Sequence, residues 1–346
     1  MANKTRGLFD EQFRLDKITK QNDPLQKLQR HIDFEMFRKP LTDHFQAGKD
    51  NKQGGRPAFD YLMMFKILIL QRYYNLSDDN TEYAILDRLS FMRFLGLTIS
   101  DTVPDAKTIW NFRNELTKAQ LVERLFESLD KKLNKNGVIV HQGKMVDASI
   151  AEVPIQRNSR EENDQLKGGE IPEEWKDNPN KLRQKDIDAK WVRKGHQDFF
   201  GYKNHIKADT KTKLITGYIV TSANIPDNNV LFDLLNKKDQ HQKLYADSAY
   251  RSESIELELK RRKIKSAVHE KGYRHKKLTA RQAEQNKKKS QVRARIEHVF
   301  GFMTNSMNRM YYRCRSYLRV ETTLGLVNIT YNLFRVTQLK GNLRLA

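Results

Sequence analysis

The amino-acid sequence predicts an α/β protein in which an all-helical region precedes a mixed sheet flanked by helices. Apolar residues recur at helical spacing from residue 57 to about residue 135. After Gly137 the pattern changes, and short strand-like runs alternate with helical ones. We therefore expect a helical domain at residues 1–136 and an α/β domain at residues 137–346.

The first domain begins with a polar stretch at residues 1–56, which we expect to be irregular, and continues with helices. The expected helices span residues 60–74, 80–96, 104–116 and 118–137, with Asp105 as an N-cap and Gly96 and Gly137 as helix ends. The segments at 80–95 and 105–118 are a candidate helix-turn-helix, in which Lys107, Asn111 and Arg113 would read DNA. Their connection is longer than the usual three or four residues or so, and simple bundle packing is the alternative.

The second domain has strand-like runs that are interrupted once by a charged stretch. We expect strands at residues 144–153, 200–209, 214–224, 243–250 and 264–270, and helices at 228–238, 252–263 and from about 279 onward. Residues 156–198 hold few apolar side chains, so we expect an insertion there, between the first two strands. Asp227 is a candidate N-cap for the helix that follows it.

The composition favours a polyanionic partner. The chain has 64 Lys and Arg against 43 Asp and Glu, which gives a net charge of +21 at pH 7. Nucleic acid is the first candidate and a membrane surface the second. The longest apolar run, at 61–70, holds a lysine and is shorter than the ~20 residues of a membrane span, so we expect no membrane insertion. A single cysteine excludes an intramolecular disulfide and a multi-cysteine zinc site.

Three carboxylates are candidates for chemistry. Asp147 lies inside the apolar run "KMVDASI", Asp247 lies where the strand of "LYADSAY" ends, and Glu297 lies beside an apolar helical stripe. Each has an ordinary alternative: an Asp at a sheet edge, a turn cap, and a surface ion pair with Arg293. If the three converge, charges ~4 Å apart repel by roughly 4 kcal/mol at an effective dielectric of about 20. Mg²⁺ ions offset that repulsion and support phosphodiester chemistry.

Two further residues compete with Asp147 as the first carboxylate. Asp188 lies in a polar, charge-rich stretch, where an Asp requires no metal. Asp209 borders a probable hairpin turn, which is a common place for Asp. Only Asp147 is flanked by apolar residues on a strand that we expect to be central, where burial raises the free-energy cost of the carboxylate.

The ordered motifs "MVDASI", "FGYKNHIKAD", "VTSANIPDN", "YADSAYRS" and "RARIEHVFG" resemble those of the DDE transposases of bacterial insertion sequences, and most of all the insertion-sequence-five family. The resemblance implies a ribonuclease H-like catalytic domain in which Asp147, Asp247 and Glu297 hold Mg²⁺, with Mn²⁺ as a substitute. It implies that the protein binds double-stranded DNA at the terminal inverted repeats of its element. The freed 3′-hydroxyl end would be transferred to target DNA.

The same resemblance implies a homodimer or larger assembly on DNA, because two ends must be cut together, in the cytoplasm and associated with the nucleoid. The rival classes are a nuclease that cuts without joining and an inactive, transposase-derived DNA-binding protein. The chain departs from the family pattern at Ser290, where a Tyr is usual, and at Thr304, where a Lys is usual. Both departures concern DNA contacts rather than metal ligands.

A basic segment at residues 271–315 is the expected phosphate-binding surface. It holds thirteen Lys and Arg residues against Glu284 and Glu297. Its tyrosines at 273, 311 and 312 are candidates for base stacking or for core packing. The residues expected to contact DNA from the second domain are Lys203, His205, Arg251, Lys287, Lys288, Lys289, Arg293 and Arg295.

Overall fold

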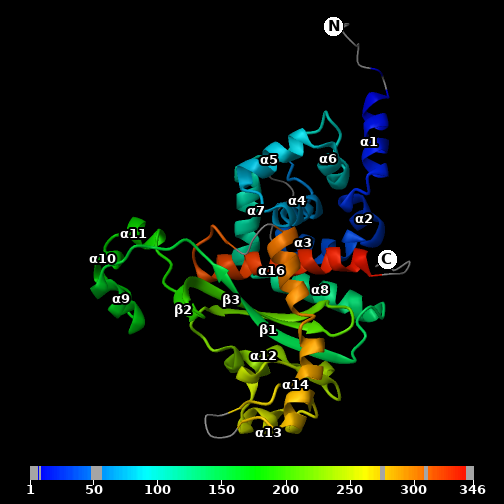
Figure 1. Ribbon diagram of the computed structural model, residues 1–346. Coiled ribbons are helices and arrows are strands. Elements are labelled where there is room, and N and C mark those ends of the chain that lie inside the picture. Colours follow the sequence, from blue (N-terminus) through cyan, green and yellow to red (C-terminus); the bar gives the residue numbers. More distant parts are fainter. Residues whose placement is uncertain (1–6, 8, 48–56, 273–276, 308–310, 340–346) are drawn as a thin grey trace. The chain divides into compact units, whose positions relative to one another are not determined.

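The computed structural model describes residues 7, 9–47, 57–272, 277–307 and 311–339 (Figure 1). The chain divides into two compact units, Met1–Asn136 with Ile329–Ala346, and Gly137–Asn328. Helix α16 (Tyr317–Gln338) contributes residues to both units. The predicted architecture, an N-terminal helical region followed by a mixed α/β region, is confirmed.

Helices make up the described part of the first unit. They are α1 (Asp10–Lys20), α2 (Pro24–His31), α3 (Arg38–Phe45), α4 (Tyr61–Tyr74), α5 (Asp78–Asp87), α6 (Leu89–Leu95), α7 (Ala106–Lys118) and α8 (Leu121–Lys135). The predicted apolar helix is α4, which is buried over most of its surface and is capped by the Asp60 carboxylate. Asp105 caps α7 as predicted, by accepting a hydrogen bond from the backbone N–H of Thr108.

Two predictions for this unit are wrong. The segment expected to be irregular contains α1, α2 and α3, because short amphipathic helices there bury residues such as Leu25 and Leu28. The single helix expected at 80–96 is two helices, α5 and α6, because Arg88 between them adopts an extended backbone. The guanidinium of Arg88 lies over the rings of Tyr74 and Phe91, and these contacts hold the break in place.

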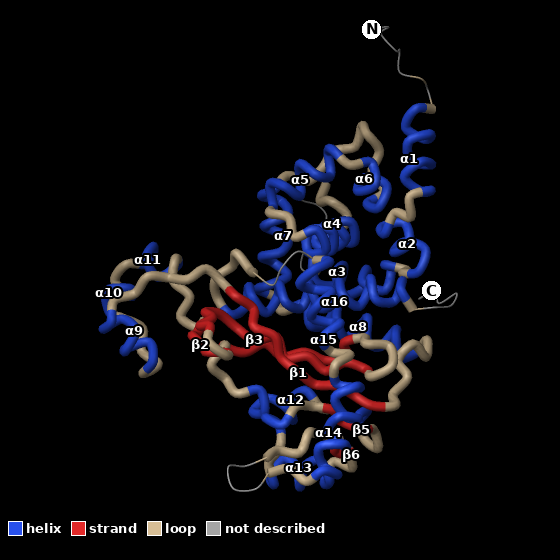
Figure 2. Tube along the Cα trace, viewed as in Figure 1, coloured by secondary structure: helices blue, strands red, loops and turns tan. Residues whose placement is uncertain are grey.

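The second unit is built on one six-stranded mixed sheet (Figure 2). Its strands are β1 (Gly143–Glu152), β2 (Lys190–Lys194), β3 (Gln197–Asp209), β4 (Ile215–Ser222), β5 (Lys243–Tyr245) and β6 (Lys265–Ser266). The strand order is β2-β3-β1-β5-β6, and β4 pairs with β3. Strand β1 is antiparallel to β3 and parallel to β5, so it lies in the interior of the sheet, as predicted for the strand that carries Asp147.

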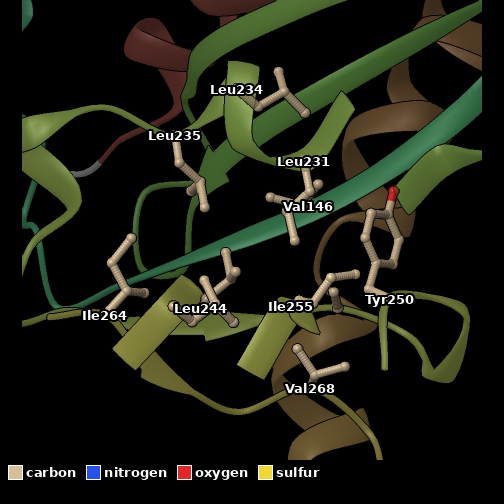
Figure 3. Close-up of a cluster of buried hydrophobic side chains, with 11 residues drawn as sticks. Val146, Leu231, Leu234, Leu235, Leu244, Tyr250, Ile255, Ile264 and Val268 are labelled. Atoms are coloured by element: carbon tan, nitrogen blue, oxygen red, sulfur yellow. The ribbon is translucent and has the colours of Figure 1, made fainter. Parts of the chain in front are cut away.

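A hydrophobic cluster supports the parallel strands (Figure 3). It combines Val146 of β1 and Leu244 of β5 with side chains of α12 (Leu231–Leu234) and α13 (Glu253–Arg261), including Leu231 and Ile255. Ala246 and Tyr250, which flank Asp247, belong to the same cluster. The residues next to both catalytic candidates on these strands are therefore anchored in the core.

The charged stretch at 156–198 is more ordered than its composition predicts. It contains α9 (Arg160–Lys167), α10 (Glu173–Lys176), α11 (Pro179–Arg183) and β2. The Trp175 side chain is fully buried there and its indole N–H donates to Glu162 at 2.7 Å. An aromatic anchor, a strand added to β3 and hydrogen bonds to Asp186 thus organise a segment that is otherwise polar.

Other boundaries also differ from expectation. Asp227 is not an N-cap, because the chain enters a 3₁₀ turn at Asp227–Val230 before the short helix α12. The long helix expected from residue 279 is interrupted: α14 spans Ala280–Arg293, and α15 spans Glu297–Gly301. A π-helical turn at Phe302–Ser306 follows.

We predict that Gly201→Ala destabilises the second unit by about 3 kcal/mol, because strain and a clash arise together. Gly201 has φ = 150°, and a Cβ atom there would lie 2.2 Å from the carbonyl oxygen of Ala151 on β1. Urea denaturation should show the loss as a lower unfolding midpoint. Gly301→Ala is the matched control, because a Cβ atom there meets nothing within 4 Å, and an equal loss in both variants would contradict the prediction.

Candidate active site

Asp147 is a carboxylate held on an interior strand. Its side chain is 18% exposed, and Arg293 Nη1 donates to its Oδ2 at 3.0 Å. Its other oxygen, Oδ1, accepts from the backbone N–H of Ala148 at 2.9 Å. Burial raises the pKa of Asp147 to about 6, against the lowering effects of the Ala148 hydrogen bond and the Arg293 charge. The ordinary alternative of an edge-strand Asp therefore does not apply.

The parallel register of β1 and β5 brings Asp247 beside Asp147. The last residues paired between these strands are Met145 and Tyr245, and each carboxylate lies two residues beyond its own member of that pair. Asp247 Oδ1 accepts from the backbone N–H of Ala249 at 2.8 Å, so it also caps the turn that follows β5. Asp247 therefore does cap a turn, as its ordinary alternative predicts, and its carboxylate also lies just after the carboxyl end of β5.

Glu297 is the first residue of α15 and its side chain is 61% exposed. Consecutive hydrogen bonds from Arg295, Ile296 and Glu297 to the carbonyls three residues earlier tighten the chain between α14 and α15. Arg293 Nη1 lies 3.6 Å from Glu297 Oε1, so the expected ion pair across one helical turn is present although the helix is interrupted. The buried stripe below it holds Ile296, Val299 and Met303.

Asp247 and Glu297 act electrostatically on Asp147. After burial, the charges of Asp247 and Glu297 both raise the pKa of Asp147. Of these groups, Arg293 alone supplies a positive charge, through a nitrogen that contacts two of the three carboxylates. The site therefore carries an excess of negative charge, in keeping with the expectation of convergence.

Oxygen donors of this kind suit a hard divalent cation such as Mg²⁺. The arrangement of these donors is not that of a metal site: among the residues that the structure describes, no group of three or more His, Cys, Asp and Glu side chains is placed to hold a metal ion. Arg293 bridges Asp147 and Glu297 instead. The donor set fits a cation, and its present geometry is that of an arginine-bridged pair with Asp247 alongside.

Sequence reasoning named Lys203, His205 and Asp227 but did not predict that they contact one another, and it did not single out Tyr250. Lys203 Nζ forms an ion pair with Asp227 Oδ1 at 2.8 Å, and the Nδ1 atom of His205 lies 3.9 Å from the same oxygen. The Tyr250 hydroxyl is buried without a hydrogen-bond partner among the described atoms. Burial raises the pKa of Tyr250, and the charges of Asp227, Asp147 and Asp247 raise it further.

The alternatives to Asp147 have structural roles. Asp209 is fully buried, and its Oδ1 accepts hydrogen bonds from Lys211, Thr212 and the Thr212 hydroxyl, as expected of a turn residue. Asp188 lies in the insertion, where its backbone N–H donates to Asp186 and its carbonyl accepts from Ser222.

Comparison with known proteins identifies the chain. Residues 145–333 match the family described as Transposase DDE domain, and residues 13–115 match the one described as Transposase domain (DUF772). The chain belongs to the DDE transposase family. Among solved structures, the chain is similar to the one described as the cryo-EM structure of the piggyBac transposase synaptic complex with hairpin DNA. It has 12% sequence identity and a TM-score of 0.46, and the match covers 91% of this chain and 75% of that one.

Several residues of this DDE transposase that we expected to bind phosphate already contact other side chains of the protein. His205 is fully buried, its Nε2 atom lies 2.8 Å from the Thr221 hydroxyl, and burial lowers its pKa to about 4. Lys203 is only 11% exposed and is paired with Asp227. Neither side chain is open to a phosphate in this arrangement, because β3 lies inside the sheet and its neighbours neutralise or cover them.

Other basic residues near the carboxylates also have partners. Arg251 pairs with Glu256 and Glu270, and Lys289 donates to the Val268 carbonyl. Arg295 donates to the Thr210 carbonyl. These contacts orient the loops around the site and leave each side chain partly exposed.

The open positive charges of the second unit include those on α14, a helix without buried residues. Lys287 is exposed, and Lys288, which pairs with Glu284, is 72% exposed. Arg274, Lys276 and Arg309 of the basic segment, like Tyr273, lie outside the described residues. Of the tyrosines that are described, Tyr311 is 43% exposed and Tyr312 is buried.

In the helical unit of the transposase, the candidate reading residues differ in availability. Lys107 is exposed on α7. Arg113 instead pairs with Asp78 at the start of α5, at 2.6 Å, and with Gln71 of α4. Because this arginine ties three helices together, the structure assigns it a packing role rather than an open base-reading position.

The two departures from the family pattern have local partners. The Ser290 hydroxyl lies 3.3 Å from His269 Nε2, and the exposed Thr304 donates to the Phe300 carbonyl within the helical segment. Neither side chain contacts a carboxylate of the site in the described structure.

We predict that Asp147→Asn stabilises the protein at pH 7.5 by about 1–3 kcal/mol in EDTA. Burial favours the protonated carboxyl, with a folded-state pKa of about 6 against an ordinary value of 3.8. The wild type therefore gains stability below about pH 4 and loses it as the pH rises through 6, whereas the variant has no such titration. Urea unfolding at several pH values measures the difference, and a stability difference that does not shrink toward pH 4 would contradict the assignment.

Proposed function

We propose that this transposase binds the terminal inverted repeats of its element, hydrolyses phosphodiester bonds there and transfers the freed 3′-hydroxyl end to target DNA. The observation that carries the proposal is the β1–β5 register, which places Asp147 and Asp247 side by side, within electrostatic reach of Glu297. Membership of the insertion-sequence-five family and a ribonuclease H-like class for the mixed sheet are parts of the same proposal.

Asp147, Asp247 and Glu297 would hold Mg²⁺, with Mn²⁺ as a substitute. The bound cations supply an activated water or 3′-hydroxyl and stabilisation of the leaving oxygen. The protein itself supplies the anionic ligands on a rigid strand pair and positive groups for the substrate. The charge excess of the carboxylates, which Arg293 only partly offsets, supports this assignment.

The basic residues of the second unit would position DNA. Lys287 and Lys288 project from α14, the helix that ends at Arg293, so phosphates bound along it lead toward the carboxylates. The helical unit would recognise the terminal repeats, with exposed Lys107 as a candidate contact. A dimer or larger assembly on DNA and association with the nucleoid complete the proposal. None of the described helices combines the length and apolar character that a membrane span requires.

Replacing a carboxylate should abolish chemistry and preserve DNA binding. We predict that Asp147→Asn, Asp247→Asn and Glu297→Gln each reduce cleavage and strand transfer by about a thousandfold or more. DNA affinity should stay equal or rise, because a negative charge near phosphate is lost. Gel assays of cleavage and of joining a pre-cut end measure both steps.

Asp188→Asn is the control for this prediction and should remain close to wild-type activity. If Asp147→Asn cuts normally while Asp188→Asn is inactive, the first ligand is misassigned. An active site that cuts but never joins a pre-cut end would favour a nuclease instead.

Exposed lysines on α14 should contribute to affinity without reading sequence. We predict that the double variant Lys287→Gln and Lys288→Gln weakens binding to all duplexes and lowers the slope of log K against log salt by about 1.8, at about 0.9 per lost phosphate contact. Fluorescence anisotropy at several salt concentrations measures the slope. Lys260→Gln with Lys263→Gln removes the same charge from α13 and the turn after it, and an equal drop in that control would count against a specific role for α14.

A further inference from the structure

The guanidinium of Arg293 lies between two of the proposed metal ligands, Asp147 and Glu297. Its Nη1 atom lies 3.0 Å from Asp147 Oδ2 and 3.6 Å from Glu297 Oε1. A divalent cation shared by these two carboxylates would meet a positively charged nitrogen already lying between them. Like charges at such distances repel strongly in a partly buried site. Arginine and metal therefore compete for the same oxygen atoms.

Arg293 is held incompletely in this position. Its Nε atom is buried and has no hydrogen-bond partner among the described atoms, and its side chain is 25% exposed. An arginine fixed as a structural element normally satisfies more of its five donors. A buried unsatisfied donor costs free energy, so a better acceptor would draw this side chain away.

The backbone around Arg293 provides a place to move. Arg293 is the last residue of α14, and the hydrogen bonds of the next three residues are of the tighter i→i−3 type. A π-helical turn follows α15. Departures from regular α-helix of both kinds are common at functional hinges. The residue that bridges the carboxylates thus lies at a joint in the chain.

We propose that Arg293 is the resident cation of the carboxylate site and that a DNA phosphate withdraws it, so that DNA binding and divalent-metal binding promote each other. This inference rests on the proposed function, and it adds a regulatory step to the same site. A phosphate accepts two hydrogen bonds from a guanidinium in a planar fork, which neither Asp147 nor Glu297 provides here. Transfer of Arg293 to the phosphate would free carboxylate oxygens at the moment when substrate arrives.

The first experiment measures Mn²⁺ binding to the full chain without DNA, by the electron paramagnetic resonance signal of free Mn²⁺. Arg293→Gln should bind Mn²⁺ about tenfold or more tightly than the wild type, because a competing positive charge is removed. Arg295→Gln removes the same charge two residues away, where the side chain contacts the Thr210 carbonyl, and should bind like the wild type. Adding Asp147→Asn to Arg293→Gln should abolish the gain.

Equal or weaker Mn²⁺ binding by Arg293→Gln, or an equal gain in Arg295→Gln, would overturn the proposal. Thermal denaturation in EDTA checks that each variant is folded, and Arg293→Met replaces the Gln variant if that one unfolds early. Because the readout is metal binding without turnover, it can succeed in a chain that does not transpose. The metal-binding test can also fail in a chain that does transpose, so the role of Arg293 and the proposed transposase activity are tested separately.

The second experiment adds a duplex of arbitrary sequence to the same titration. In the wild type, DNA should increase Mn²⁺ affinity, because phosphate takes over the guanidinium; by reciprocity, Mn²⁺ should increase DNA affinity by the same factor. In Arg293→Gln the coupling factor should fall toward one. A coupling of equal size in both proteins would mean that DNA and metal assist each other without Arg293, and would overturn the withdrawal step.

Discussion

The candidate site depends on the parallel pairing of β1 with β5. The pairing ends at Met145 and Tyr245, and two residues after each of them comes a carboxylate, Asp147 or Asp247. Val146 and Ala246, which precede the two carboxylates, are buried in one hydrophobic cluster with α12 and α13. Two negative charges are therefore held together by apolar packing next to them, not by any attraction of their own. The free energy of burying the cluster offsets the repulsion that the site requires.

This constraint explains the electrostatic character of the surroundings. The charges of Asp247 and Glu297 raise the pKa of Asp147, and the single positive charge of Arg293 offsets only part of this negative charge. A second pair of charges, Lys203 with Asp227, is partly buried and is already balanced. The Lys203–Asp227 pair is electrically neutral as folded, whereas the three carboxylates with Arg293 carry an excess of negative charge.

Local patterns predicted much of this from the sequence. Asp147 was recognisable because burying a carboxylate inside an apolar strand is costly, and Asp105 was recognisable because N-caps are local. Features set by long-range contacts were not predictable. In the sequence, Arg113 has the pattern of an exposed helical residue, and only the fold brings Asp78 beside it. His205 has the pattern of a residue on a strand surface, and only the fold buries it.

Interruptions without Gly or Pro were missed for the same reason. At the break, Arg88 lies over the aromatic rings of Tyr74 and Phe91, and the tightened turn before Glu297 contains the buried Ile296. Strand β2 was missed because an edge strand with mostly exposed side chains carries almost no apolar signal.

The segment between β1 and β3 has a consequence for how this chain can vary. Glu152 at the end of β1 pairs directly with Gly201 of β3, so the long excursion between them departs from and returns to neighbouring points on the sheet. Within it, Trp175 is fully buried and bonded to Glu162, while Asp186 and strand β2 tie the end of the excursion to β3. Closing a longer or shorter loop between fixed ends changes the free energy only slowly with length. The part of the excursion before Asp186 can therefore change in length while the strand register beneath it, and with it the spacing of the carboxylates, stays the same.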